Sequence, residues 1–212
     1  MSDRPRLVGL DVAADAAAWR AAGFDVGTDD VVRIGTTDLR LTAAPGARGL
    51  HGWTLAGAVP DGDGTLEGVR TAIAGPAPRD DAPAPPHPNG VGAIDHIVLA
   101  TPDTTRTFEA LDAAGFELRR VRDAGPELRQ GFFLFADLVL EVVGPPEPRP
   151  EGGVGGSASL WGVTLVAPDL AAPAFGPHLG APRDAVQAGR KIAVFDRAAG
   201  LGTRIALMTP RP

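Results

Sequence analysis

The sequence predicts an α+β fold in which tandem βαβββ units form a curved mixed sheet, with helices outside and a cleft inside. The first observation is the run "IDHIVLATPDTTRTFEALDAAG" from Ile94, which joins an apolar strand to a helix. The second is that three strand-like runs follow this helix directly. The third is that the chain repeats the order, because internal repeats indicate units that bury a common core by packing together.

The central unit, residues 92–146, carries the clearest pattern. Asp103 follows a proline and is the predicted N-cap of the helix. Phe108 and Leu111 recur at helical spacing and belong to its predicted buried face, and Gly115 is its predicted stop. The strands that follow are predicted in "FELRRV", "LRQGFFLF" and "LVLEVVG".

The C-terminal unit, residues 158–212, repeats this order. Its first run, "LWGVTLVAPDL", aligns with "IDHIVLATPDT", with the dipeptide "PD" in register. A short helix interrupted by proline is predicted in "LAAPAFGPHLG", and strands are predicted in "RDAVQ", "KIAVFDR" and "RIALMTP". We expect the central and C-terminal units to pair with each other.

Residues 1–75 are predicted to form a degenerate third copy. "LVGLDVAAD" leads to a shortened helix in "AAAWRAAGF", and later runs add strands that complete no full copy. Two segments have the composition of linkers: the Pro-rich residues 76–91 and the Pro- and Gly-rich residues 147–157. In the first of these, His87 is expected to be solvated.

The composition limits the partners. The 212 residues include no cysteine and carry a formal net charge of −6, so any metal needs His, Asp, Glu or Gln ligands and nucleic acid is a poor partner. No apolar run reaches the ~18 residues of a membrane span. The start "MSDRPRLVGL" lacks the pattern of a signal peptide. We expect a cytoplasmic protein with a small-molecule partner and no nucleic-acid or membrane partner.

Together with "QGFFLFADLVLEVVGP" and "WGVTLVAPDL", the run from Ile94 resembles the vicinal oxygen chelate superfamily, which includes glyoxalase I, extradiol dioxygenases and bleomycin-resistance proteins. The likeness implies a glyoxalase-like protein. In the enzymes of the superfamily, each unit of a pair supplies one metal ligand from its first strand and one from its last. The metal ion then holds two neighbouring substrate oxygens and stabilises an oxyanion.

Carried over to this chain, the resemblance implies His96 and Glu141 as metal ligands and Glu141 as a catalytic base. Strand alternation supports the pair. His96 shares one face of its strand with Val98, and Glu141 shares one face of its strand with Val139 and Val143. If the other, apolar faces of the two strands pack on the helix, His96 and Glu141 both point into the cleft. An imidazole and a carboxylate suit Zn, Fe, Mn, Ni or Co.

The C-terminal unit departs from the superfamily pattern. Gly162 aligns with His96 and Ala206 aligns with Glu141, and neither residue can bind a metal. The paired units would therefore supply two ligands instead of four. A homodimer is one arrangement that would bring two such pairs together. The alternative is that His96 and Glu141 form a hydrogen-bonded pair in a degenerate site without a metal cofactor.

Three further residues are candidates for ligand binding. Gln130 could offer its amide to a ligand, and Phe132 and Trp161 could line an apolar pocket. Each is equally compatible with an ordinary place in a strand or in the core. For Arg190 and Lys191, in "QAGRKIAVF", a solvated hairpin is favoured over a carboxylate-binding role.

Three functions remain open at this point. The first is a glyoxalase-like protein that binds a small molecule in the sheet cleft with a degenerate metal site. The second is a lyase, isomerase or dioxygenase that depends on one divalent metal ion and acts on vicinal oxygens. The third is a resistance protein that sequesters a drug.

Overall fold

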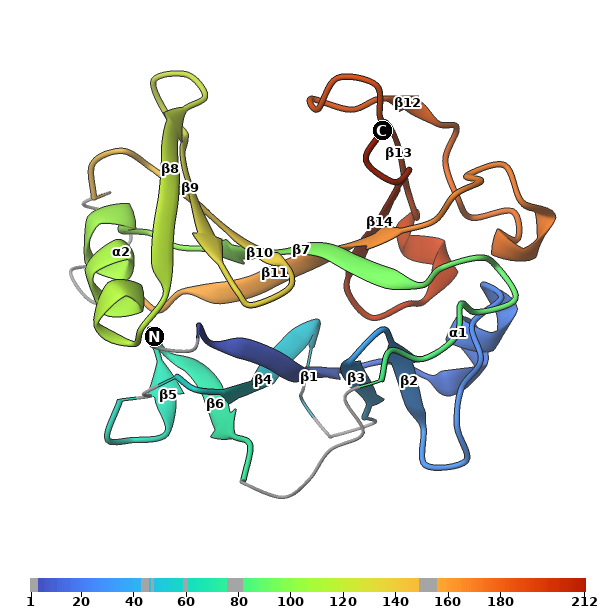
Figure 1. Cartoon of the computed structure of the whole chain (residues 1–212), viewed down its shortest axis with the longest axis horizontal. Helices are drawn as coiled ribbons and strands as arrows, with labels where there is room; N and C mark the ends of the chain where they lie inside the picture. Colours follow the sequence, from blue (N-terminus) through green and yellow to red (C-terminus); the bar gives the residue numbers. More distant parts are fainter. Residues whose placement is uncertain (1–3, 43–45, 47, 59–60, 76–81, 149–155) are drawn as a thin grey trace. The chain divides into compact units, whose positions relative to one another are not determined.

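The computed structural model describes residues 4–42, 46, 48–58, 61–75, 82–148 and 156–212, whose strands form two sheets (Figure 1). The larger sheet contains β7 (Ala93–Ala100), β8 (Glu117–Asp123), β9 (Arg129–Leu134), β10 (Val139–Gly144), β11 (Ser159–Val166), β12 (Arg183–Asp184), β13 (Lys191–Val194) and β14 (Arg204–Met208). The smaller sheet contains β1 (Arg6–Val12), β2 (Val31–Ile34), β3 (Thr37–Leu41), β4 (Leu50–Ala56), β5 (Thr65–Leu66) and β6 (Val69–Ile73).

The strand order confirms the tandem repeat and the α+β class. The eight-stranded sheet has the order β12-β13-β14-β11-β7-β10-β9-β8. In the central copy, the first strand β7 pairs in parallel with the last strand β10, and β10 pairs antiparallel with β9. In the C-terminal copy, β11 pairs in parallel with β14, and β14 pairs antiparallel with β13. The sheet is therefore mixed, as the βαβββ pattern predicts.

The N-terminal segment differs from the single degenerate copy that its sequence predicts. The six-stranded sheet has the order β2-β3-β1-β4-β6-β5, so both β1-β3-β2 and β4-β6-β5 follow the order of a copy that has lost one strand. The helix α1 (Ala16–Ala21) belongs to the first of these shortened copies. No helix lies between β4 and β5 among the described residues. The loss of these parts explains why the sequence pattern is weak.

Helix α2 (Thr104–Ala113) begins and ends as predicted. The side chain of Asp103 caps it by accepting a 3.0 Å hydrogen bond from the N–H of Arg106. Gly115, with φ +93°, follows the helix in the left-handed conformation that glycine tolerates. Leu111 is buried as predicted, whereas Phe108 is only partly buried, with its ring edge-on to another aromatic ring of the sheet.

The C-terminal copy has no α-helix at the predicted place. Pro173–Phe175 form a single 3₁₀ turn instead, and Gly176 follows it with φ +70°. A proline at the first position is compatible with the turn, but the glycine three residues later ends it before an α-helical turn can form.

The chain divides into two compact units that are not consecutive segments. Unit 1 consists of residues 1–9, 51–78 and 96–161, and unit 2 consists of residues 10–50, 79–95 and 162–212. Unit 1 has an aromatic core in which Trp53, Phe116 and Phe135 pack against one another. The N-terminal 75 residues thus contribute to both units.

Among the described residues, no helix combines the length and the apolar character that are needed to traverse a lipid bilayer.

Candidate functional site

Strands β7, β10 and β9 of unit 1 carry the predicted site residues on one face. In the parallel register of β7 and β10, His96 lies opposite Val139, and Val98 lies opposite Glu141. Residues opposite each other, and residues two apart on one strand, point to the same face of a sheet. His96 and Glu141 therefore share a face, as their alternation predicts.

Three polar side chains meet on this face. The Nε2 atom of His96 lies 3.6 Å from the Oε2 atom of Glu141, and the two side chains are 14% and 16% exposed. The amide Nε2 of Gln130 donates a 2.6 Å hydrogen bond to the other carboxylate oxygen, Oε1. One carboxylate thus lies between an imidazole and an amide, each supplied by a different strand.

Apolar side chains flank the carboxylate. Phe132 of β9 lies opposite Glu141 in the antiparallel register, and Val98 of β7 lies opposite it on the other side. Phe132 is partly exposed, whereas Val98 is buried. We call this surface the His96 face, defined by His96, Glu141, Gln130, Phe132 and Val98.

The opposite face of the same strands packs against α2. The ring of Phe108 lies so close to Gly131 that a Cβ atom there would come within 2.5 Å of it. Glycine is therefore required for this contact of ring with backbone. Because Gly131 separates Gln130 from Phe132, the contact helps to fix the segment that presents both side chains to the His96 face.

The donor atoms on the His96 face meet the needs of a metal ion only in part. Two ligands bound tetrahedrally at about 2.1 Å lie about 3.4 Å apart, which is close to the separation of the His96 and Glu141 donor atoms. The Oε1 atom of Gln130 is buried and receives no hydrogen bond from the described chain. The described residues contain no group of three His, Cys, Asp or Glu side chains with the spacing of a metal site. The donors therefore fit an ion in part, as two ligands whose donor atoms lie close enough together to share it.

The equivalent positions of unit 2 supply no donor. In the register of β11 and β14, Gly162 lies opposite Arg204, and Thr164 lies opposite Ala206. The pair Gly162–Arg204 corresponds to His96–Val139 in unit 1, and the pair Thr164–Ala206 corresponds to Val98–Glu141. Gly162 and Ala206 are therefore the equivalents of His96 and Glu141. A Cβ atom at Gly162 would lie 2.8 Å from the carbonyl oxygen of Arg204. A histidine would fit there only if the backbone moved.

Trp161 is not brought to the His96 face. It precedes Gly162 and by alternation shares the opposite face of β11 with Val163 and Leu165. Its side chain is 49% exposed. The structure therefore groups Gln130 and Phe132 with the His96–Glu141 pair but leaves Trp161 outside this group.

Two arginines that the sequence did not single out lie on this face. Strand β8 has a bulge between Leu118 and Arg120, after which Arg120 lies opposite Phe132 and Arg122 lies opposite Gln130. Simple alternation from Glu117 would have placed both arginines on the other face. Because a bulge adds one residue and reverses the alternation, the sequence pattern alone misplaces them.

Arg190 is not part of a solvated hairpin. Its side chain is 2% exposed, and its Nη2 atom lies 2.7 Å from the Oδ1 atom of Asp95, which is 8% exposed. Its Nε atom also donates a 2.7 Å hydrogen bond to the carbonyl of Thr209. Arg190 therefore binds a carboxylate of its own chain within unit 2. Lys191 is exposed and pairs with Asp184, as a hairpin residue would.

His87 is buried, although its Pro-rich surroundings predict a solvated side chain. Its Nδ1 atom accepts a 3.1 Å hydrogen bond from the N–H of Asp25, and its ring lies edge-on to Phe24. Burial lowers the pKa of His87, an effect that the charge of Asp25 and the carbonyl of Arg33 oppose. Residues 82–91 thus include packed chain, while residues 76–81 lie outside the described residues.

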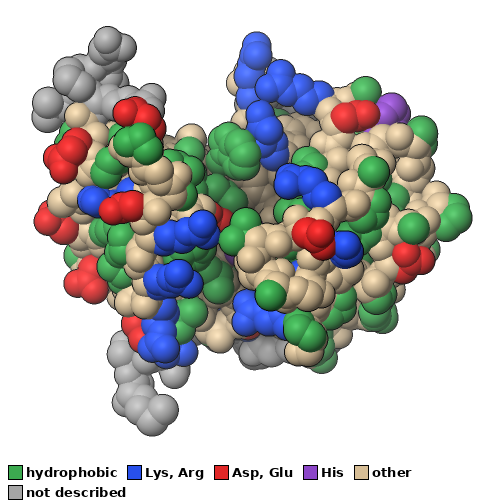
Figure 2. Space-filling view, turned by 90° about the horizontal axis from the view of Figure 1, so that it is seen from above, with side chains coloured by type: hydrophobic (Ala, Val, Ile, Leu, Met, Phe, Trp, Pro, Cys, Tyr) green, Lys and Arg blue, Asp and Glu red, His purple; other side chains and the backbone are tan. Residues whose placement is uncertain are grey.

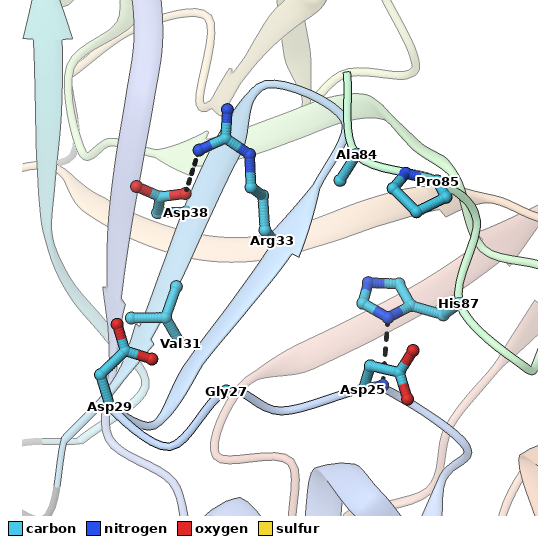
Figure 3. A pocket seen from close by; sticks show the side chains of 9 residues that line it. All are labelled: Asp25, Gly27, Asp29, Val31, Arg33, Asp38, Ala84, Pro85 and His87. Carbon is cyan, nitrogen blue, oxygen red and sulfur yellow. Dashed lines mark hydrogen bonds and ion pairs between the residues drawn. The ribbon is translucent and has the colours of Figure 1, made fainter. Parts of the chain in front are cut away.

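A cavity of about 460 Å³ lies beside His87 in unit 2 (Figure 3). Asp25, Asp29 and Asp38 line it together with Arg33, which pairs with Asp38 at 3.4 Å. None of the predicted site residues lines this cavity. It is therefore separate from the His96 face of unit 1.

No protein-family model and no curated protein sequence matches the chain. Similar solved structures include a methylmalonyl-CoA epimerase from Mycobacterium tuberculosis, at 19% identity over 58% of this chain and 91% of that chain, with a TM-score of 0.44. One from Streptomyces coelicolor has 20% identity over 56% and 97% of the two chains, with a TM-score of 0.42.

A xylose isomerase-like TIM barrel/4-hydroxyphenylpyruvate dioxygenase fusion protein is similar over 98% of this chain, at 14% identity and a TM-score of 0.59. The chain spans 49% of the fusion protein. At this identity the likeness concerns the fold alone, but it extends over both sheets.

Proposed function

We propose that the protein is a glyoxalase-like protein that binds a small molecule on the His96 face of unit 1. The observation that carries this proposal is the grouping of His96, Glu141 and Gln130 from three strands beside the partly exposed ring of Phe132. Small-molecule sites combine an apolar surface with a few convergent polar groups. Here the carboxylate and imidazole would accept or donate hydrogen bonds, and the phenyl ring would contact the apolar part of the ligand.

The proposed site is degenerate with respect to metal. Gly162 and Ala206 occupy the positions where unit 2 would contribute its ligands, and the close approach of Gly162 to Arg204 leaves no room for a larger side chain. Two protein ligands leave the remaining positions around an ion to solvent or substrate. We therefore expect weak binding of divalent metal by the single chain.

A metal-dependent lyase, isomerase or dioxygenase is the second candidate. The 3.6 Å separation of the His96 and Glu141 donor atoms favours it, because this distance allows both atoms to contact one ion. A bound metal would polarise neighbouring oxygens of the substrate, and Glu141 would serve as the base. Two copies of the chain in a homodimer would supply four ligands.

Binding on the His96 face is tested with a neutral apolar dye, N-phenyl-1-naphthylamine, whose fluorescence rises in apolar sites. We expect saturable binding that Phe132→Ala weakens at least fivefold. Val186→Ala is the matched control, because Val186 is a highly exposed apolar residue of unit 2. Saturable binding that is equally strong in Phe132→Ala would place the dye elsewhere and contradict the proposal.

Metal binding distinguishes the two candidates. Stripped protein is dialysed against micromolar Zn²⁺, Mn²⁺ or Ni²⁺, and bound metal is measured by mass spectrometry together with the mass of the assembly in solution. The binding protein is expected to retain little metal. Retention of one ion per chain or per dimer, abolished by both His96→Ala and Glu141→Gln, would favour the metal-dependent enzyme.

A further inference from the structure

We infer that the His96 face selects ligands that combine a flat apolar body with an anionic group, and that Arg120 and Arg122 of β8 bind this group. The inference rests on the proposed function, since it assumes that the His96 face is a binding site. It adds the chemical class of the ligand and two residues that would determine specificity.

The strand registers place a carboxylate, an aromatic ring and a guanidinium in one row. Glu141 of β10 lies opposite Phe132 of β9, and Phe132 lies opposite Arg120 of β8. In the neighbouring row, Gln130 of β9 lies opposite Arg122 of β8. The two arginines are therefore next to the two ligand candidates on β9, on the same face of the sheet.

The two guanidinium groups are available to a ligand. Arg120 and Arg122 are exposed, and neither forms an ion pair or a side-chain hydrogen bond with any described residue. Other arginines of the same hairpin have partners: Arg119 lies 2.8 Å from Glu117, and Arg129 lies 2.9 Å from Asp123. The hairpin thus leaves two positive charges uncompensated within the described chain, both on the face that carries Phe132.

The spacing indicates the size of the ligand. Neighbouring strands lie about 4.8 Å apart, so Glu141 on β10 and Arg120 on β8 are separated by about 10 Å, with Phe132 between them. A ligand with one or two fused rings could lie over Phe132 with its anionic group near the arginines. Its other end would then reach Glu141 and His96. Figure 2 shows Lys and Arg side chains exposed at several places across the viewed face.

An anion is the ligand group that arginine favours. The planar guanidinium donates paired hydrogen bonds to carboxylate, sulfonate or phosphate oxygens. At the other end of the row, the carboxylate of Glu141 would repel an anion, which fixes the direction in which the ligand lies. The competing explanation is that the arginines only protect the exposed edge of β8 from pairing with other chains. That explanation predicts no effect on ligand binding.

The test compares two dyes that share a naphthylamine body. 8-Anilinonaphthalene-1-sulfonate carries an anionic group, and N-phenyl-1-naphthylamine is neutral. Affinities are measured by fluorescence titration for the wild type, for Arg120→Gln/Arg122→Gln and for Arg197→Gln/Arg211→Gln. The second double variant removes the same charge from two exposed arginines of unit 2, and therefore controls for the net charge of the protein.

We expect Arg120→Gln/Arg122→Gln to raise the Kd of the sulfonate at least tenfold and to change the Kd of the neutral dye less than twofold. The control variant should change neither Kd more than twofold. The inference is overturned if both double variants weaken sulfonate binding equally, or if neither does. If the neutral dye still binds in a manner that depends on Phe132, the proposed function survives that result. If neither dye binds the wild type, both proposals fail.

Discussion

The amide of Gln130 donates a 2.6 Å hydrogen bond to Glu141, whose other carboxylate oxygen lies 3.6 Å from the imidazole of His96. The carboxylate is therefore oriented by two neighbouring strands. The sequence predicts Gln130 only as a candidate for ligand binding. In the folded chain, Gln130 is also the hydrogen-bond partner of Glu141, the predicted catalytic base.

Replacing Gln130 with leucine should destabilise the fold and disturb this orientation. A hydrogen bond to a charged group contributes about 1.5–3 kcal/mol, and partial exposure lowers this, so we expect Gln130→Leu to lower the free energy of unfolding by about 1–2 kcal/mol. Urea denaturation measures the change. Gln187→Leu, in an exposed turn, is the control and should change it by less than about 0.5 kcal/mol. Equal losses in both variants would contradict the role of the Gln130–Glu141 hydrogen bond.

Glu67 should stabilise unit 1 through helix α2. Its Oε2 atom accepts hydrogen bonds from the hydroxyl of Thr107 at 2.6 Å and from Arg106 at 3.0 and 3.1 Å, and its side chain is 10% exposed. Glu67→Ala leaves these donors without their acceptor and is expected to cost about 2–3 kcal/mol of unfolding free energy. The exposed Glu109→Ala, on the same helix as Thr107, should cost less than about 0.5 kcal/mol.

A double-mutant cycle isolates the contact between Glu67 and Thr107. Because the two side chains share a hydrogen bond, Glu67→Ala and Thr107→Val should be non-additive by at least about 0.5 kcal/mol. Additive losses, measured by urea denaturation of the two single variants and the double variant, would show that the contact contributes no stability of its own.

Gly162 should not tolerate a side chain. A Cβ atom there would lie 2.8 Å from the carbonyl oxygen of Arg204, so Gly162→Ala forces the β11–β14 pair apart and should lower the unfolding free energy by about 1–3 kcal/mol. At Gly75 an added Cβ would meet nothing within 4 Å, and Gly75→Ala should be nearly neutral. Thermal unfolding of both variants makes the comparison. A stable Gly162→Ala protein would show that steric crowding does not exclude a metal ligand from this position.

His87 should make the stability of the protein depend on pH. Burial lowers its pKa in the folded chain below the ordinary value of 6.5, so the unfolded chain binds the proton more tightly. The contribution of neutral His87 to the unfolding free energy is complete above pH 6.5. It is lost as the pH falls below that value toward the pKa of His87 in the folded chain. We therefore expect the unfolding free energy to decrease as the pH is lowered from 7.5 to 5.5.

The contribution of His87 is the part of this decrease that His87→Asn removes. Asparagine can still accept the hydrogen bond from the N–H of Asp25 but has no titrating ring. The difference in unfolding free energy between wild type and His87→Asn should therefore change with pH in this range. If it remained constant from pH 7.5 to pH 5.5, His87 would not be the group responsible.

The sequence by itself determined the features that depend on local periodicity. The strand-to-helix run from Ile94, the N-cap at Asp103 and the stop at Gly115 follow from residue types at fixed spacing, and the structure has each of them. Alternation on two strands was also enough to place His96 and Glu141 on a common face. The alignment of Gly162 with His96 is matched by the strand registers, because both copies use the same pairing of first and last strands.

Only the tertiary structure decided the features that depend on long-range pairing. The bulge in β8 reverses the alternation and brings Arg120 to the His96 face, and no local pattern marks where such a bulge occurs. The burial of His87 and the pairing of Arg190 with Asp95 join segments far apart in the chain, in a loop and a hairpin whose composition predicts exposure. Periodicity specifies which side chains of one element share a face. Burial and polar pairing depend on which elements pack together, and this is determined by the sum of many weak contacts across the whole chain.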